Sequence, residues 1–175
     1  MKKAIFLDRD GVINQAKIID GKPYSPNSID ELILLPKVFD ALKILKKAGF
    51  FLLVITNQPD VARGIVKKKS IEKIHKFLKK IFPIDDIFVC FHDDDENCNC
   101  RKPNPGNIYK AIKKYNIDIS SSFIIGDRWK DIEAGKKVGC KTIFIDYNYK
   151  EKRPVSFDFK VNSLYSATKI IINQI

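Results

Sequence analysis

The chain has 175 residues and a mass of 20.1 kDa, enough for one well-buried core with little left over for a second domain. Hydrophobic residues make up 45% and charged residues 30%, which excludes a disordered tail and a fibrous repeat. No apolar run is long enough to span a membrane, and no signal-peptide pattern precedes the first predicted strand. We therefore expect one domain over residues 1–175, monomeric and cytoplasmic.

The net charge of +11 raises the question of a nucleic-acid partner. The lysines, however, occur in small groups such as Lys46-Lys47 and Lys67-Lys68-Lys69, spread over several predicted helices and not interleaved with exposed aromatic residues. This pattern favours a solvated surface over a nucleic-acid-binding stripe. A positive field of this kind would still attract small anionic substrates such as phosphate esters.

The first predicted strand ends in two acids. Ala4 to Leu7 form an unbroken apolar run, as in a strand buried on both faces, and Asp8 and Asp10 follow it. Gly11 permits a sharp turn that keeps both carboxylates at the rim of the sheet. Two carboxylates 4 Å apart repel each other by about 4 kcal/mol at an effective dielectric of 20, so the pair calls for a cation such as Mg²⁺. The alternative is a simple turn cap followed by an Asp-Gly hairpin.

The middle of the chain alternates between helical and strand patterns. Residues 15–30 are rich in turn formers and form a predicted flap beside the acids. A helix is predicted from Pro36 to Gly49, followed by an apolar strand from Phe50 to Ile55. Lys67 to Phe82 has the apolar spacing of an amphipathic helix. Because His75 lies off the apolar face, we expect it on the surface.

The remaining elements continue this alternation. We predict strands at Ile87–Phe91, Phe123–Ile125 and Thr142–Ile145, and helices at Ile108–Tyr115, Lys130–Val138 and Leu164–Ile172. Alternating strands and helices predict an α/β fold, a three-layer Rossmann-like parallel sheet covered on both faces. The intervals between the strands leave no room for a large cap domain.

Three of the predicted strands end in polar groups, at Asp8, Thr56 and Asp127. In parallel sheets, ligands bind outside the carboxyl ends of the strands. Core strands need no reactive groups at their ends, so this recurrence indicates an active site.

A second constellation consists of two closely spaced pairs of soft ligands, Cys90 with His92 and Cys98 with Cys100. Four such ligands match a closed tetrahedral Zn²⁺ site over loop 90–100, and a cytoplasmic chain would not hold disulfides there. The alternative is two buried cysteines and an unrelated histidine. Cys140 stands alone and is expected in the core.

Taken together, four segments resemble the motifs of the haloacid dehalogenase superfamily of phosphatases, in the right order along nearly the whole chain. They are Asp8-Arg9-Asp10-Gly11, Thr56-Asn57-Gln58, Arg101-Lys102-Pro103 and the run from Gly126 to Asp131. The resemblance implies that the Asp8 carboxylate attacks phosphorus and that Asp10 is the general acid and then the base.

The same resemblance implies that Mg²⁺ is held by the Asp8 carboxylate, the Asp10 backbone carbonyl and Asp127. Lys102 and the Thr56 hydroxyl would offset the charge of the phosphoryl oxygens. Asp131 would support this site from behind, or else face solvent as an ordinary helix residue.

The zinc loop narrows the resemblance to the branch that contains D-glycero-D-manno-heptose 1,7-bisphosphate 7-phosphatases and histidinol-phosphate phosphatases. We favour the sugar bisphosphate as substrate. The candidate substrate contacts are Asn57, Arg63, Arg101 and Arg128, although the arginines fit surface ion pairs equally well. Pro59-Asp60 departs from the small residue and glycine usual in this branch, which affects specificity more than chemistry.

Three alternative functions stay open at this point. Histidinol phosphate is the next candidate substrate, and the positive charge and open site suit a nucleic-acid 3′-phosphatase, which would show a steep salt dependence of DNA binding. From a different class, the chain would be a non-catalytic binding module stabilised by zinc. The crowded acids argue against this last possibility, because a site that had lost its catalytic function would have no physical reason to keep mutually repelling carboxylates.

Overall fold

A computed structural model describes residues 1–174. Its main sheet has six parallel strands in the spatial order β5 (Asp86–Cys90), β4 (Phe51–Asn57), β1 (Ala4–Leu7), β6 (Phe123–Gly126), β7 (Lys141–Ile145) and β8 (Phe159–Val161). The strand from the start of the chain thus lies in the middle of the sheet, with β4 and β6 as its neighbours.

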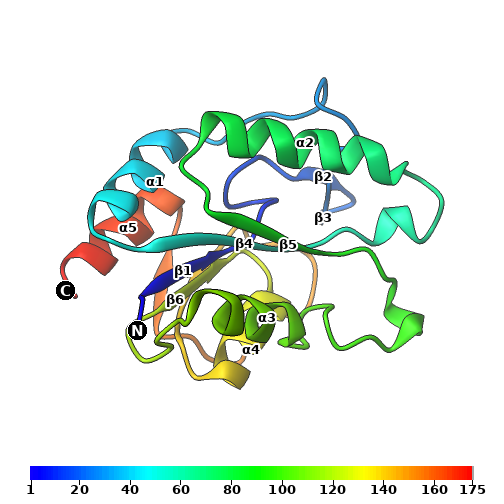
Figure 1. The fold of residues 1–175 in the computed structure, drawn as a ribbon. Coiled ribbons are helices and arrows are strands. Elements are labelled where there is room, and N and C mark those ends of the chain that lie inside the picture. The colour runs from blue at the N-terminus through cyan, green and yellow to red at the C-terminus, as the bar shows by residue number, and fades with distance from the viewer. Residues whose placement is uncertain (175) are drawn as a thin grey trace.

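Helices cover both faces of this sheet (Figure 1). One layer contains α1 (Val38–Lys47), α2 (Lys68–Ile81) and α5 (Leu164–Ile172), and the other contains α3 (Gly106–Tyr115) and α4 (Trp129–Val138). The three-layer parallel α/β architecture predicted from the sequence is confirmed.

The side chains of β1 show why its sequence is apolar throughout. Ile5 and Leu7 pack into the core cluster shared with α1, α2 and α5, whereas Ala4 and Phe6 point to the opposite face and pack with α3 and α4. All four side chains are fully buried. A strand covered on both faces has no solvent-facing positions, so its sequence does not alternate between apolar and polar residues.

Two parts of the fold were not predicted as strands. Strand β8 is a three-residue edge strand, too short to give a clear pattern. Within segment 15–30, β2 (Lys17–Ile19) and β3 (Lys22–Tyr24) form an antiparallel hairpin. Its two loop residues, Asp20 and Gly21, both have positive φ angles, as a tight Asp-Gly hairpin turn requires.

The loops at the carboxyl ends of the strands gather on one side of the molecule, at the right of Figure 1. They include the hairpin β2–β3 and two short 3₁₀ turns, η1 (Pro59–Val61) and η2 (Asp94–Glu96). In residues 1–174 no separately folded insertion lies between the core elements, and no helix is long and apolar enough to cross a membrane.

Candidate active site

Two neighbouring strands bring acids to one edge of the sheet. Strands β1 and β6 pair with Leu7 opposite Ile125, and the backbone N–H of Asp8 donates to the Ile125 carbonyl at 2.9 Å. Asp8 and Asp127 therefore leave the sheet side by side. Asp131, in the first turn of α4, joins them, and the three residues each offer a carboxylate oxygen within 4.8 Å of the others.

Two glycines make this crowding possible. Gly11 has a φ of +82°, and a Cβ at this position would lie 1.9 Å from Asp127 Oδ2. A Cβ at Gly126 would lie 2.2 Å from the Cβ of Asp131. Any side chain at either position would push an acid out of the cluster, so the close approach of the backbone is built into the site.

The cluster is buried and short of positive charge. Burial, together with the negative charge of Asp131, raises the pKa of Asp8 to about 7, although Lys102 acts in the opposite direction. Burial and the charges of Asp8 and Asp131 likewise raise the pKa of Asp127 well above its usual value. In the described part of the chain Asp127 Oδ1 is buried without a hydrogen-bond partner. Oxygen ligands, burial and an unpartnered oxygen fit a hard divalent cation such as Mg²⁺.

Lys102 is the internal counter-charge of this cluster. Its ammonium nitrogen lies 2.8 Å from Asp8 Oδ1 and 2.6 Å from Asp131 Oδ1, and it donates to the Ile55 carbonyl at 2.6 Å. The lysine is 3% exposed. Asp131 is 2% exposed, so the alternative of a solvent-facing helix residue is wrong.

Asn57 fixes the backbone of this lysine. Its amide nitrogen donates to the Lys102 carbonyl at 3.0 Å, and its Oδ1 accepts from the Lys102 N–H at 3.1 Å. Asn57 therefore connects the end of β4 to the lysine loop. The neighbouring Thr56 is buried, and its hydroxyl oxygen accepts a hydrogen bond from Gln58.

The carboxylate of Asp10 does not join the cluster of three acids. It accepts three hydrogen bonds from the Arg9 guanidinium and others from Asn14, Ser25 and Gln58. Although burial raises the pKa of Asp10, the positive charge of Arg9 and these hydrogen bonds outweigh it and lower that pKa below its ordinary value. Asp10 is therefore ionised in this arrangement, and its orientation is fixed by several donors.

His75 differs from its predicted surface position. It is only 9% exposed, and its Nε2 lies 3.2 Å from Nη1 of the fully buried Arg9. Burial and the adjacent guanidinium lower the pKa of His75 to about 3, so the ring is neutral and its Nε2 can accept from Arg9. The apolar pattern of α2 did not reveal this contact, because the partner lies 66 residues away in the sequence.

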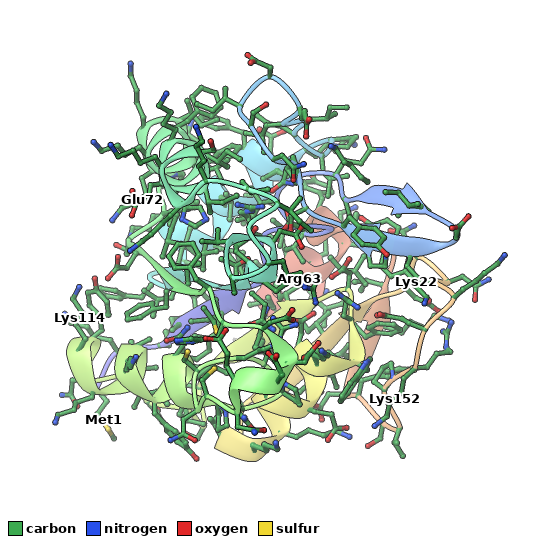
Figure 2. The ribbon with its side chains drawn as sticks, turned by 90° about the vertical axis from the view of Figure 1, so that its right-hand side faces the viewer. Met1, Lys22, Arg63, Glu72, Lys114 and Lys152 are labelled. Atoms are coloured by element: carbon green, nitrogen blue, oxygen red, sulfur yellow. The ribbon has the colours of Figure 1, made fainter. Side chains whose placement is uncertain are left out.

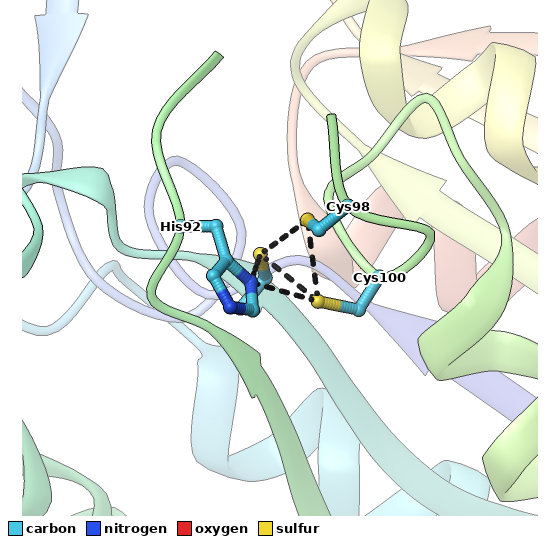
Figure 3. A group of neighbouring side chains, drawn as sticks. His92, Cys98 and Cys100 are labelled. Carbon is cyan, nitrogen blue, oxygen red and sulfur yellow. Dashed lines mark hydrogen bonds between the residues drawn. The ribbon is translucent and has the colours of Figure 1, made fainter. Parts of the chain in front are cut away.

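The four soft ligands of loop 90–100 converge as predicted (Figure 3). The closest contacts among the sulfur atoms of Cys90, Cys98 and Cys100 and Nδ1 of His92 measure 3.2 to 3.6 Å. A tetrahedron with metal–sulfur bonds of about 2.3 Å has edges of about 3.8 Å, so the donor set fits one metal ion. Cys140 lies apart from them and is buried in the core, as predicted.

An outer cavity of about 210 Å³ adjoins the acid cluster. Figure 2 looks onto the side of the molecule on which Lys22 and Arg63, two of its lining residues, lie. All three arginines considered as substrate contacts line the cavity, and each one is also ion-paired: Arg63 with Asp93 and Asp60, Arg101 with Asp94, and Arg128 with Glu151.

Several residues of the site were not selected by sequence reasoning. Arg9 and Gln58 stand inside recognised motifs, but their role as a frame for Asp10 depends on a contact between distant segments. Ser25 comes from the hairpin segment, and Tyr149, which donates to Asp127 Oδ2 at 2.8 Å, comes from the loop after β7. No spacing pattern in the sequence links these residues to the strand ends.

Comparisons with known proteins agree with this geometry. A family model described as haloacid dehalogenase-like hydrolase matches residues 16–139. The chain is 34% identical to the D-glycero-alpha-D-manno-heptose-1,7-bisphosphate 7-phosphatase of Photorhabdus laumondii, over 97% of this chain and 96% of that protein. It is 37% identical to the corresponding beta-anomer phosphatase of Helicobacter pylori, over 90% of this chain and 94% of that protein.

Solved structures agree with the fold as well. The crystal structure of the D,D-heptose 1.7-bisphosphate phosphatase from B. bronchiseptica, complexed with magnesium and phosphate, superposes with a TM-score of 0.84 at 28% identity, covering 99% of each chain. The family model spans more than half of the chain, and both relatives match this chain over nearly its whole length. The chain belongs to the haloacid dehalogenase-like hydrolases.

Proposed function

We propose that the chain is a Mg²⁺-dependent phosphatase that removes the 7-phosphate of D-glycero-D-manno-heptose 1,7-bisphosphate. The observation that carries this proposal is the meeting of the carboxylates of Asp8, Asp127 and Asp131, with the Lys102 ammonium in contact with the first and the last of them. The named substrate of the end-to-end relatives supports the sugar bisphosphate. Those relatives are named for both anomers.

Mg²⁺ would be held by Asp8 and Asp127, together with the backbone carbonyl of Asp10, and it would neutralise phosphoryl oxygens as a Lewis acid. The magnesium and phosphate in the B. bronchiseptica structure support this choice of ion. The unpartnered Oδ1 of Asp127 is the structural sign of a ligand position. Asp131 keeps Lys102 beside Asp8 through the 2.6 Å contact.

In the first half-reaction the Asp8 carboxylate attacks phosphorus and the bond from phosphorus to the sugar oxygen breaks. Lys102 lies 2.8 Å from Asp8 Oδ1, and the backbone N–H of Arg9 also donates to this oxygen, so the carboxylate is oriented before attack. The product is an aspartyl phosphate and a sugar alkoxide. A proton from Asp10 converts the alkoxide into the hydroxyl of the released sugar.

In the second half-reaction water attacks the phosphorus of the aspartyl phosphate. Asp10 takes the proton of that water, and the bond from phosphorus to Asp8 breaks, which releases phosphate and regenerates the carboxylate. The ionised state of Asp10, fixed by Arg9, suits this role as base. Its earlier role as acid requires a proton, and the proton that Asp10 takes from water in one turnover is the one that it donates to the sugar alkoxide in the next.

We further propose that Cys90, His92, Cys98 and Cys100 hold Zn²⁺ in a purely structural role. Four protein donors close a tetrahedral site and leave no position for water. Cys100 immediately precedes Arg101 and Lys102, so an ion in this site would fix the loop that carries the catalytic lysine. The hairpin β2–β3 and this loop would form the walls that select the substrate, because both contribute residues to the outer cavity.

The test is a phosphate-release assay with heptose 1,7-bisphosphate, histidinol phosphate and a 3′-phosphorylated oligonucleotide. We expect the highest kcat/KM for the bisphosphate, dependence on Mg²⁺, and loss of activity in Asp8→Asn. The exposed Asp95→Asn is the matched control and should keep full activity. A higher kcat/KM for either other substrate would replace the proposed one, and full activity of Asp8→Asn would refute the mechanism.

A further inference from the structure

The outer cavity is strongly cationic, and much of its charge is already neutralised by acids. Five cationic side chains and two acidic ones line it: Lys22, Arg63, Arg101, Arg128, Lys130, Asp60 and Asp94. Arg128 and Lys130 also line the smaller cavity that contains Asp8 and Asp127, so the two spaces are continuous. A substrate with one phosphate over Asp8 can therefore place a second anionic group in the outer cavity.

Asp94 occupies a central position among these cations. Its Oδ1 accepts from Arg101 Nε at 2.7 Å and lies 3.1 Å from Lys130 Nζ. The two cations are 10% and 19% exposed at the side chain, whereas Asp94 is 62% exposed. The acid thus covers the two cations from the solvent side. Because most of its side chain already faces water, the Asp94 carboxylate can rotate away from the cations and remain solvated.

The backbone beneath Asp94 is held in place. Asp94 begins the turn η2, whose capping box joins the Asp93 side chain and the Glu96 side chain to backbone N–H groups. The turn lies between His92 and Cys98, two of the four converging soft ligands. A rotation of the Asp94 side chain can therefore uncover Arg101 and Lys130 without moving the loop.

We infer that the Asp94 carboxylate occupies the binding position of the substrate's second phosphate until the substrate binds. We infer further that Lys130 pairs with that phosphate once Asp94 has moved away, and that Lys130 is therefore a specificity-determining residue. The inference rests on the proposed function and adds two residues to it. A phosphate group carries nearly two negative charges and three acceptor oxygens, so it replaces a single exposed carboxylate on Arg101 and Lys130. A monoester without a second anionic group cannot drive this exchange, and so it gains nothing from the two cations.

The test compares heptose 1,7-bisphosphate with p-nitrophenyl phosphate, which has no second phosphate, in Asp94→Asn and Lys130→Met. Asp94→Asn removes the competing charge, and we expect it to lower the KM for the bisphosphate about two- to five-fold while leaving kcat and the KM for the monoester nearly unchanged. Lys130→Met should lower the ratio of kcat/KM for the bisphosphate to kcat/KM for the monoester about tenfold or more. Asp95→Asn, an exposed acid on the same turn, is the matched control.

A bisphosphate KM that is unchanged or raised in Asp94→Asn, with the metal content of the loop intact, would overturn the inference. So would a Lys130→Met variant that keeps the wild-type ratio, and this second variant decides the matter if Asp94→Asn fails to fold. If the wild-type enzyme hydrolyses p-nitrophenyl phosphate but does not prefer the bisphosphate over it, the proposed function itself fails. If the preference is present and both variants leave it unchanged, only the inference about Asp94 and Lys130 fails.

Discussion

Replacing Asp8 with asparagine should stabilise the protein in Mg²⁺-free buffer. In that state Asp8 is a buried acid beside Asp131 and Asp127, and Lys102 alone does not compensate the three negative charges. Asparagine keeps an oxygen that can accept from the Lys102 ammonium but removes the charge. The trade of activity for stability is expected where a site gathers groups that repel one another.

The size of the expected gain in the free energy of unfolding follows from the pKa of Asp8, which burial and the charge of Asp131 raise from 3.8 to about 7. At 1.36 kcal/mol for each pKa unit, the ionised carboxylate costs the folded state about 4 kcal/mol relative to the unfolded chain. Because the folded pKa is the higher one, this cost is absent below pH 4, grows as the pH rises, and is complete above pH 7. The gain from Asp8→Asn should follow the same curve, with about 4 kcal/mol as its upper bound.

The measurement is urea unfolding of wild type and Asp8→Asn at pH values from 4 to 8, in buffer without Mg²⁺ and without a chelator that would strip other metals. We expect the free energy of unfolding to differ little at pH 4 and to favour the variant by about 2 to 4 kcal/mol at pH 8. Mg²⁺ should stabilise only the wild type. Equal or lower stability of Asp8→Asn at pH 8 would show that Lys102 already compensates the cluster.

Three further changes test other parts of the site. Cys100→Ser removes one of the four soft donors, so the zinc content should fall and the free energy of unfolding should decrease by several kcal/mol. Cys100→His keeps a fourth donor and should retain the metal. Zinc analysis and urea unfolding of both variants test this. His75→Leu leaves the buried Arg9 short of an acceptor, and we expect a loss of roughly 1–3 kcal/mol in stability with reduced kcat, both partly restored in His75→Gln. Asn57→Ala removes both hydrogen bonds to the Lys102 backbone and should lower kcat more than it changes KM. An equal effect on kcat and KM would instead assign Asn57 to substrate binding.

The sequence allowed the sheet and its reactive edge to be predicted for a physical reason. A strand buried on both faces must be apolar throughout, so β1 and β4 were recognisable, and a polar residue directly after such a run must lie at the rim. Parallel pairing then places Asp8 and Asp127 together without further information. The convergence of the four soft ligands was predictable because all four lie within eleven residues of one another.

What the sequence could not show is which charged groups neutralise one another across long separations. The contact of Arg9 with His75 joins the turn after β1 to α2, and that of Asp94 with Lys130 joins loop 90–100 to α4. Each of these four residues also has the features of an ordinary surface residue when its own helix or turn is considered alone. Such pairs depend on how the layers are packed, and no periodicity within one element records that.

The central claim is that the Asp8 carboxylate forms a bond to phosphorus. The most direct test is a single-turnover reaction of the wild-type enzyme with heptose 1,7-bisphosphate labelled with ³²P at the 7-phosphate, quenched in acid at early times and mapped by peptide digestion. The aspartyl phosphate forms before water attacks it, so we predict transient label on the peptide that contains Asp8 and no label when Asp8 is replaced by asparagine. Release of free phosphate with no labelled peptide at any time would contradict the account.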